Sequence, residues 1–289
     1  MPAWVLGVIG GSGLYEIEGL QHPRWAAVDS PFGEPSDHLL AGTLGDVKLV
    51  FLPRHGRGHR LPPTAVNARA NIDALKRAGC TDVISLSAVG SLREALEPGT
   101  FVVVDQFIDR TFAREKSFFG PGLAAHVSMA HPVCARLSSL AAAAGRAAGA
   151  RVVEGGCYLA MEGPQFSTQA ESALYRSWGC DVIGMTNMPE AKLAREAELP
   201  YASVAMVTDY DCWHEEFAHV EVAQILEVLA ANAETARSLV RHLAAALPKT
   251  REPSPIDTAL NGALITAPAA RDPAMVAKLS AVAGRALKV

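Results

Sequence analysis

Two acidic residues, Asp209 and Asp211, follow the very apolar run Tyr201–Thr208. A carboxyl group buried at the end of such a strand, without a basic partner, has a raised pKa and can hold or deliver a proton near neutral pH. Two acids after a strand are also common as helix N-caps or as surface residues. The depth of the apolar run favours the functional interpretation, so both carboxyl groups are candidates for acid–base chemistry.

A second cluster, RHGRGHR from Arg54 to Arg60, follows the apolar run Val47–Leu52. Its guanidinium and imidazole groups lie side by side on a glycine-rich loop, which suits capture of an anion, with Arg54 able to contact two phosphate oxygens. The cluster is short and has no interleaved aromatic residues, which disfavours a nucleic-acid patch. His55 and His59 have i, i+4 spacing, but the glycines between them disfavour a helical metal site. A solvated basic turn remains the alternative.

A glycine-rich segment, VLGVIGGSGLY at residues 5–15, can bring main-chain N–H groups close to an anion. The dinucleotide pattern G-x-G-x-x-G can start at Gly11, but its sixth position is Glu16, whose carboxylate would face the pyrophosphate. The P-loop pattern requires a lysine, and none precedes Lys48. A NAD-dependent oxidoreductase, with Asp29 as the ribose ligand, and a plain tight turn both stay open, beside a loop that holds phosphate by itself.

Small hydroxyl side chains follow two other buried runs: Ser87, next to the amide of Ala88, and Thr186. Alone, each is more often a helix cap or a turn residue than a ligand. Together with Ser12 they would surround the charge of Arg54 with neutral donors. Because no P-loop lysine or Mg²⁺-binding acid cluster accompanies them, the set favours orthophosphate held as a reactant.

The segment Met161–Ser172 reads as a turn that leads into a helix. Its cap lies near Ser167 or Thr168, and Glu171 has capping-box spacing from Thr168. Phe166 in this turn offers a stacking face for a planar ring, although an aromatic residue in a turn more often serves packing.

Strands and helices alternate along the chain, and these elements must position the candidate residues. The strand-like apolar runs are Trp4–Ile9, Val47–Leu52, Asp82–Ser87, Phe101–Asp105, Asp181–Met185 and Tyr201–Thr208. The helical patterns are Thr64–Ala78, Pro132–Ala148, Thr168–Trp178, Pro189–Ala197 and Val220–Leu247. This alternation predicts an α/β domain with a mixed or parallel sheet covered on both faces. In open sheets of this class ligands lie beyond the carboxyl ends of strands, and five such ends here carry small or polar residues.

The chain beyond residue 247 has a different character. Pro248–Pro255 resembles a linker, and Pro273–Leu287 is predicted to form one further helix. We expect this tail to be a docked appendage, so that residues 1–289 form a single domain.

The composition excludes several classes of protein. The 289 residues are 49% hydrophobic and carry a formal net charge of −4, which gives no reason to expect a nucleic-acid or anionic-membrane partner. The five cysteines show no C-x-x-C spacing and indicate free thiols in a reducing compartment. The N-terminus has no basic region of a signal peptide, and no apolar run approaches membrane-spanning length. These features predict a cytoplasmic protein.

Eight motifs, in this order, resemble those of the trimeric purine nucleoside phosphorylase family: IGGSG, PRHGRGH, NARANI, SAVGSL, DQFIDRT, EGPQFS, MTNMPE and TDYDCW. The resemblance runs from about Val5 to about Leu247. It implies one α/β domain whose mixed central sheet is partly barrel-like and flanked by helices. It also implies a homotrimer that cleaves the N-glycosidic bond of a nucleoside with phosphate, without a metal or an organic cofactor.

The resemblance assigns roles to individual residues. The implied phosphate ligands are Ser12, Arg54, His55, Ser87, Ala88 and Thr186. The implied nucleoside contacts are Met185 at the ribose, Phe166, Ser167, Asp209 and Asp211 at the base, and Val222, Ile225, Leu226 and a neighbouring subunit's His126 at the 5′ group. The sequence departs from the family where relatives often have threonine, at Ser12 and Ser87, and arginine, at Gln165.

The acid at position 209 bears on the choice of substrate. A carboxylate accepts a hydrogen bond from the 6-amino group of adenine, whereas relatives that act on 6-oxopurines usually have asparagine there. Protonated Asp209 would donate to N7 of the leaving purine. An apolar 5′ pocket favours a methylthio or deoxy group. The expected reaction therefore converts 5′-methylthioadenosine to adenine and the pentose 1-phosphate, with 5′-deoxyadenosine as a second candidate substrate. A 6-oxopurine or methylthioinosine phosphorylase, a non-catalytic nucleoside sensor and the oxidoreductase are the alternatives.

Overall fold

The computed structural model describes residues 4–11, 13–214 and 222–288, with the backbone alone for residues 222–226. Its central strand is β5 (Asp82–Ser91), which has different partners along its length. β1 (Val5–Gly10) and β11 (Tyr201–Asp209) pair with β5 in parallel, on opposite sides of it. β10 (Val182–Gly184) pairs antiparallel with the last two residues of β5. These apolar runs form strands buried on both faces, as their composition predicts.

The sheet contains 11 strands and is mixed. Its outer strands are β2 (Gln21–Ala26), β3 (Leu39–Leu44), β4 (Val47–Pro53), β6 (Thr100–Val104), β7 (Gln106–Asp109), β8 (Arg151–Glu154) and β9 (Cys157–Ala160). The order runs β2-β3-β4-β1-β5-β10-β9-β7, and a second arm leads from β5 through β11 and β6 to β8. Within the described ranges β2, β7 and β8 each pair with one strand, so the sheet branches but does not close into a barrel. The predicted mixed sheet flanked by helices is confirmed.

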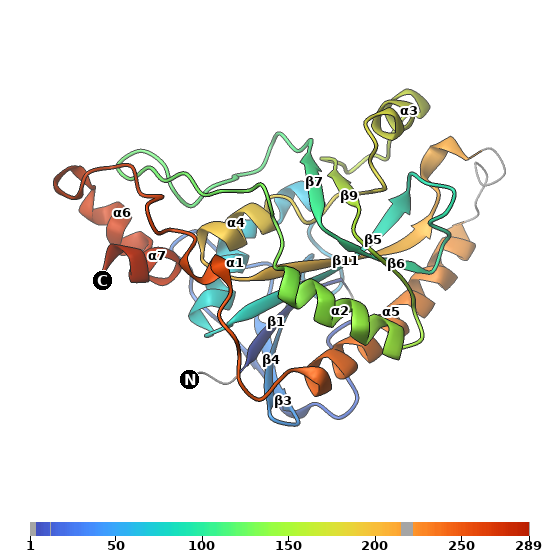
Figure 1. Ribbon diagram of the computed structural model, residues 1–289, viewed down its shortest axis with the longest axis horizontal. Helices are drawn as coiled ribbons and strands as arrows, with labels where there is room; N and C mark the ends of the chain where they lie inside the picture. The colour runs from blue at the N-terminus through green and yellow to red at the C-terminus, as the bar shows by residue number, and fades with distance from the viewer. Residues whose placement is uncertain (1–3, 12, 215–221, 289) are drawn as a thin grey trace.

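Helices cover both faces of the sheet (Figure 1). They are α1 (Ala68–Arg77), α2 (Ala135–Ala147), α3 (Gln169–Ser177), α4 (Glu190–Glu196) and α5 (Val222–Ala246). α2 packs against α5 and β11, and one hydrophobic core gathers the apolar faces of these elements. α1 packs against α4, and a second core lies beneath that pair. Each helix is therefore held by one apolar face, which explains why helical periodicity located it.

The C-terminal tail forms two helices, not the single helix predicted over Pro273–Leu287. α6 (Pro273–Lys278) and α7 (Ser280–Leu287) meet at Leu279, whose side chain is fully buried at the join. The segment expected to be a linker is fixed to the body of the protein by an ion pair, in which Arg251 contacts the buried Asp82. No helix in the described ranges is long and apolar enough to span a membrane.

The strand directions bring the candidate residues to one edge of the sheet. Four neighbouring strands of the sheet, β4, β1, β5 and β11, run parallel to one another. Their carboxyl ends therefore lie at the same edge. Gly10 and Pro53 are register partners, and the N–H of Arg54 donates to the carbonyl of Gly10 at 2.8 Å. The loops that follow these strands therefore converge, as expected for a ligand site in an α/β fold.

Candidate active site

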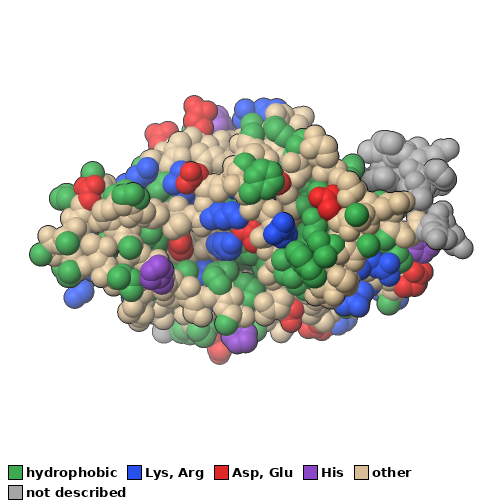
Figure 2. Space-filling model, turned by 90° about the horizontal axis from the view of Figure 1, so that it is seen from above, with side chains coloured by type: hydrophobic (Ala, Val, Ile, Leu, Met, Phe, Trp, Pro, Cys, Tyr) green, Lys and Arg blue, Asp and Glu red, His purple; other side chains and the backbone are tan. Residues whose placement is uncertain are grey.

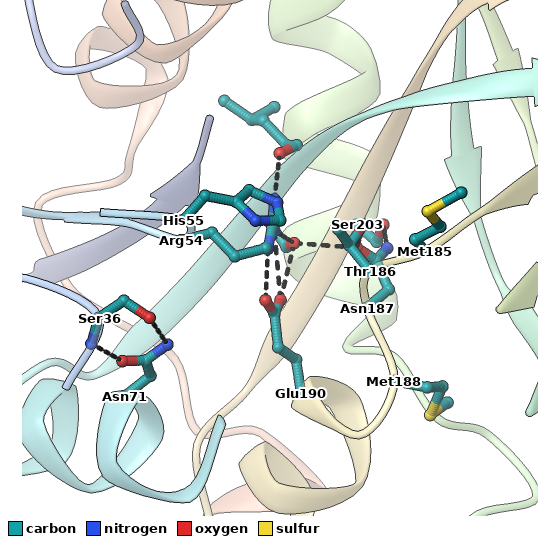
Figure 3. Close-up of polar contacts among 12 residues, drawn as sticks. Ser36, Arg54, His55, Asn71, Met185, Thr186, Asn187, Met188, Glu190 and Ser203 are labelled. Carbon is teal, nitrogen blue, oxygen red and sulfur yellow. Dashed lines mark hydrogen bonds and ion pairs between the residues drawn. The ribbon is translucent and has the colours of Figure 1, made fainter. Parts of the chain in front are cut away.

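A cavity at this edge contains four of the residues predicted from the sequence: Arg54, His55, Met185 and Thr186. They come from the loops after β4 and β10, which are far apart in the chain and close in space (Figure 3). The cavity is completed by Pro63, Val66, Ala68, Arg114, Asn187, Met188, Pro189 and Glu190. The structure thus joins an arginine, a histidine and a threonine in one place, as an anion site requires.

Arg54 is buried and pairs with Glu190 (Figure 3). Nε donates to Glu190 Oε1 at 2.5 Å, Nη2 donates to Glu190 Oε2 at 3.3 Å and to Ser85 Oγ at 2.6 Å, and Nη1 donates to the Leu86 carbonyl at 3.0 Å. Burial alone would lower the pKa of Arg54 and raise that of Glu190, but their mutual attraction outweighs it and shifts both pKa values in the opposite direction. The two-pronged guanidinium contact expected for phosphate is occupied by Glu190, which leaves one N–H, on Nη1, for an anion.

His55 lies beside Arg54, with its ring stacked on that of His59 at 4.3 Å between centroids. Its Nδ1 is 2.9 Å from the carbonyl oxygen of Leu61. Since a carbonyl only accepts, we assign the proton of the neutral ring to Nδ1, which makes Nε2 an acceptor. Burial first, and the charge of Arg54 second, lower the pKa of His55 to about 4. The ring is therefore neutral near pH 7 in the free protein.

Thr186 is held by a residue that the sequence reasoning missed, Tyr158 on β9. The Tyr158 hydroxyl is 3.1 Å from Thr186 Oγ1 and accepts from the Thr186 N–H at 3.4 Å. Gly184 makes this approach possible, because a Cβ there would lie 2.0 Å from the Tyr158 hydroxyl oxygen. Burial raises the pKa of Tyr158, so the hydroxyl keeps its proton and can donate it to Thr186 Oγ1.

The other two predicted phosphate ligands in the described ranges lie inside β5, which continues to Ser91, beyond the strand end expected at Ser87. Ser87 is buried, and its hydroxyl lies near that of Tyr158 but makes no well-formed hydrogen bond. A buried hydroxyl without a partner is costly unless a ligand satisfies it, which suits the predicted role. Ala88, the next residue, is exposed at the same edge.

The two candidate acids at the end of β11 differ in their environment. Asp209 accepts the Asp211 N–H on Oδ1 at 2.8 Å, and its Oδ2 is 2.7 Å from Thr208 Oγ1. Thr208 Oγ1 is also 3.1 Å from the Val89 carbonyl, and its single hydrogen cannot serve both contacts. The Asp209 side chain is held at the end of β11 by Thr208 and by the Asp211 N–H. Burial raises the pKa of Asp211, as expected from the sequence.

The predicted turn after β9 connects the two groups of residues. A Cβ at Gly163 would lie 2.4 Å from Met185 Sδ, so the turn packs directly against the cavity. At its other end, the Ser167 carbonyl accepts from Cys212 Sγ at 3.3 Å, beside Asp211. Phe166 is 84% exposed, which excludes the packing alternative within this chain. The capping box predicted for α3 between Thr168 and Glu171 is present.

The lining of this cavity does not include the other predicted residues that the structure describes: Ser87, Ala88, His126, Phe166, Ser167, Asp209 and Asp211. His126 is exposed, and its N–H donates to the Ala263 carbonyl at 2.9 Å. Gln165 is also exposed. Ser12 lies outside the described residues, as do the side chains of Val222, Ile225 and Leu226 at the start of α5.

Comparison with known proteins gives the family. The model of the phosphorylase superfamily matches residues 5–245. The chain belongs to this superfamily. It is 63% identical to the S-methyl-5′-thioadenosine phosphorylase of Cereibacter sphaeroides, over 98% of this chain and 99% of that protein. The corresponding protein of Rhodospirillum rubrum is 62% identical over 98% of this chain and 97% of that protein.

Solved structures of phosphorylases share the fold. The methylthioadenosine phosphorylase from an antarctic soil metagenomic library is 44% identical, with a TM-score of 0.92 over 98% of this chain and 99% of that one. The methylthioadenosine phosphorylase of Schistosoma mansoni in complex with adenine is 40% identical, with a TM-score of 0.76 over 84% and 91% of the two chains.

The sequence reasoning missed two residues that shape the candidate anion site of this phosphorylase. Glu190 stands in the motif MTNMPE and begins α4, but its type and position gave no sign of a partner. The available signal was indirect, because an arginine at the end of an apolar strand needs an acid if it is buried. Tyr158 could have been suspected only from Gly184, a small residue in a buried strand that lets a side chain approach.

Proposed function

We propose that this phosphorylase cleaves 5′-methylthioadenosine with orthophosphate, giving adenine and 5-methylthioribose 1-phosphate. The observation that carries the proposal is near full-length identity of 62–63% to proteins named S-methyl-5′-thioadenosine phosphorylase. The cavity at Arg54, His55 and Thr186 supports it, because its hydrogen-bond donors and the buried guanidinium of Arg54 suit an inorganic anion.

In the proposed reaction the bond from C1′ to N9 of adenine breaks and a bond from C1′ to a phosphate oxygen forms. Positive charge develops on the ribose ring, and the bound phosphate stabilises it and then attacks C1′. Phosphate would be held by the hydroxyls of Ser12, Ser87 and Thr186, the Ala88 amide, His55 and the free Nη1 hydrogen of Arg54, with Met185 against the ribose. No metal or organic cofactor enters these steps.

Asp209 is the proposed acid for the leaving base. Protonated Asp209 gives its proton to N7 as the C1′–N9 bond lengthens, which avoids a purine anion as the leaving group. The contacts of Asp209 with Thr208 Oγ1 and with the Asp211 N–H support this role, since they fix the direction of its carboxyl group at the end of β11. Asp211, Phe166 and Ser167 would contact the purine, with a carboxylate recognising the 6-amino group.

We also propose that the protein is a cytoplasmic homotrimer. In this arrangement a neighbouring subunit's His126 would complete the 5′ pocket formed by Val222, Ile225 and Leu226. Large apolar side chains exposed in the single chain include Phe112 and Phe166, at 82% and 84%. Figure 2 shows apolar side chains gathered beside charged ones on one face, which is compatible with a face that another copy covers.

The test is phosphate-dependent release of base from 5′-methylthioadenosine, 5′-deoxyadenosine, adenosine, methylthioinosine and inosine. We expect the first two to have the highest kcat/KM and the two 6-oxopurines the lowest, by roughly 10³-fold or more. A preference for methylthioinosine or inosine would contradict the proposed substrate. Purine binding without phosphorolysis in excess phosphate would instead indicate a nucleoside sensor.

A further inference from the structure

Arg114 lines the same cavity as Arg54 but has no donor left for a ligand. Its Nε donates to Glu162 Oε1 at 2.8 Å. Nη1 donates to the carbonyls of Met185 and Met188, each at 2.8 Å, and Nη2 donates to the carbonyls of Glu162 at 2.7 Å and Met161 at 3.4 Å. All five N–H groups are therefore used within the protein. Arg114 therefore fixes the segments that line the cavity and does not contact the anion.

Both carboxylate oxygens of Glu162 accept hydrogen bonds from within the protein. Besides Arg114, Oε1 accepts from the Thr64 hydroxyl at 2.7 Å. Oε2 accepts the main-chain N–H groups of Phe112 at 2.6 Å and Ala113 at 3.0 Å. Burial alone would raise the pKa of Glu162, but these hydrogen bonds outweigh it and lower the pKa to about 2. The carboxylate is therefore ionised near neutral pH.

The pair joins four segments at this cavity: the loop before α1, the loop after β7, the turn after β9 and the loop after β10. Arg114 holds two carbonyls in the last loop, those of Met185 and Met188, which precede and follow Thr186 in the sequence. The Met188 N–H also donates to the Thr186 carbonyl at 2.7 Å, so the loop is a tight turn. A displaced guanidinium would displace the turn that carries Met185 and Thr186.

We infer that Arg114 and Glu162 are positioning residues for phosphorolysis, which hold the Met185–Met188 turn so that the Thr186 hydroxyl faces the phosphate. The inference rests on the proposed function, because it takes Thr186 as a phosphate ligand. It differs from a purely stabilising role, since it requires the carbonyl contacts of Nη1 as well as the ion pair. Small errors in position at a reacting centre lower rates strongly.

Arg114→Lys separates these two contributions. A lysine keeps the charge opposite Glu162, but its single nitrogen cannot span the carbonyls of both Met185 and Met188. We expect the KM for phosphate to rise about tenfold and kcat to fall, with the KM for 5′-methylthioadenosine changed less than about threefold. Arg146→Lys, in the exposed pair of Arg146 with Glu154 at 2.7 Å, is the matched control and should change none of these values.

A second variant, Arg114→Ala, tests the guanidinium itself by chemical rescue. Millimolar methylguanidinium should restore part of kcat and of phosphate affinity, and methylammonium should restore neither. Two results would overturn the inference. One is an Arg114→Lys variant whose kcat and KM for phosphate are both within twofold of the wild-type values. The other is an Arg114→Ala variant that loses activity only as it unfolds and is not rescued. If the wild type shows no phosphorolysis, the proposed function fails. Calorimetric titration with inorganic phosphate then tests the positioning role by itself: weaker binding in Arg114→Lys than in the wild type supports it, and unchanged binding contradicts it.

Discussion

Nε of Arg54 lies 2.5 Å from Oε1 of Glu190, and both side chains are at most 4% exposed. Because the carboxylate compensates the guanidinium, the proposed anion site carries less positive charge than the motif RHGRGHR implies. Phosphate would be met mainly by hydroxyl and amide donors and by one N–H of Arg54. Such a site releases its anion more readily than one built on a free cation, which suits a phosphate that must move to C1′.

Glu190→Gln should destabilise the protein by about 3–5 kcal/mol, because it leaves the buried charge of Arg54 without a partner. Inorganic phosphate should then supply the missing negative charge. We therefore expect phosphate to raise the Tm of the variant by more than it raises the Tm of the wild type, as measured by thermal unfolding with and without phosphate.

Glu234→Gln serves as the matched control for this prediction. Glu234 pairs with Arg237 on the exposed face of α5, where an ion pair contributes little to stability. Its Tm and the response of its Tm to phosphate should match those of the wild type. An equal phosphate response in Glu190→Gln and the wild type would show that Arg54 does not sense the anion.

Tyr158→Phe should raise the KM for phosphate by roughly 2- to 10-fold, the usual effect of losing one neutral hydrogen bond. The reason is that Thr186 Oγ1 and the Thr186 N–H both lose their contact with the Tyr158 hydroxyl. Steady-state kinetics at varied phosphate concentration measure the effect. Tyr175→Phe, at a buried tyrosine of α3, is the control and should leave the KM for phosphate unchanged. An unchanged KM in Tyr158→Phe as well would mean that Thr186 needs no orientation from β9.

The parts of the site that could be predicted are those fixed by local chemistry. An apolar strand followed by Arg54 and His55, or by Thr186, places polar groups at a sheet edge whatever the rest of the chain does. The partner of Arg54 could not be predicted, because any of the chain's 30 acidic residues could have been brought there by the fold. The packing of α4 against α1 places Glu190 beside Arg54, and this packing is a property of the tertiary structure.

The elements follow the same division. The six strands predicted from continuous apolar runs are present, whereas β2, β3, β7, β8 and β9 were missed. β2 is largely exposed and contains Pro23, and β7 and β8 each begin and end with a polar residue, so none of the three is a continuous apolar run. The break between α6 and α7 was also missed, because the burial of Leu279 depends on what the tail packs against.

His55 should make the folded state lose stability as the pH falls from about 6.5 towards 4. The unfolded chain takes up a proton near the ordinary pKa of 6.5, while the folded chain does so only near its lowered pKa of about 4. The contribution reaches roughly 3 kcal/mol at pH 4. Urea unfolding at several pH values, compared between the wild type and His55→Asn, measures it. The variant's free energy of unfolding should fall less steeply over this range, and equal slopes would assign the loss to other groups.

Asp209→Asn should shift the preference of the enzyme from adenine towards 6-oxopurine nucleosides. The amide can donate to a 6-oxo oxygen, whereas the carboxylate accepts from a 6-amino group. The variant also loses the proton donor for N7, so kcat for 5′-methylthioadenosine should fall by roughly 10²- to 10⁴-fold. The measurement is the ratio of kcat/KM for 5′-methylthioadenosine to that for methylthioinosine. Asp46→Asn, at an exposed turn between β3 and β4, should leave this ratio at the wild-type value. A ratio that Asp209→Asn leaves unchanged would show that residue 209 does not read the purine edge, even if the rate falls.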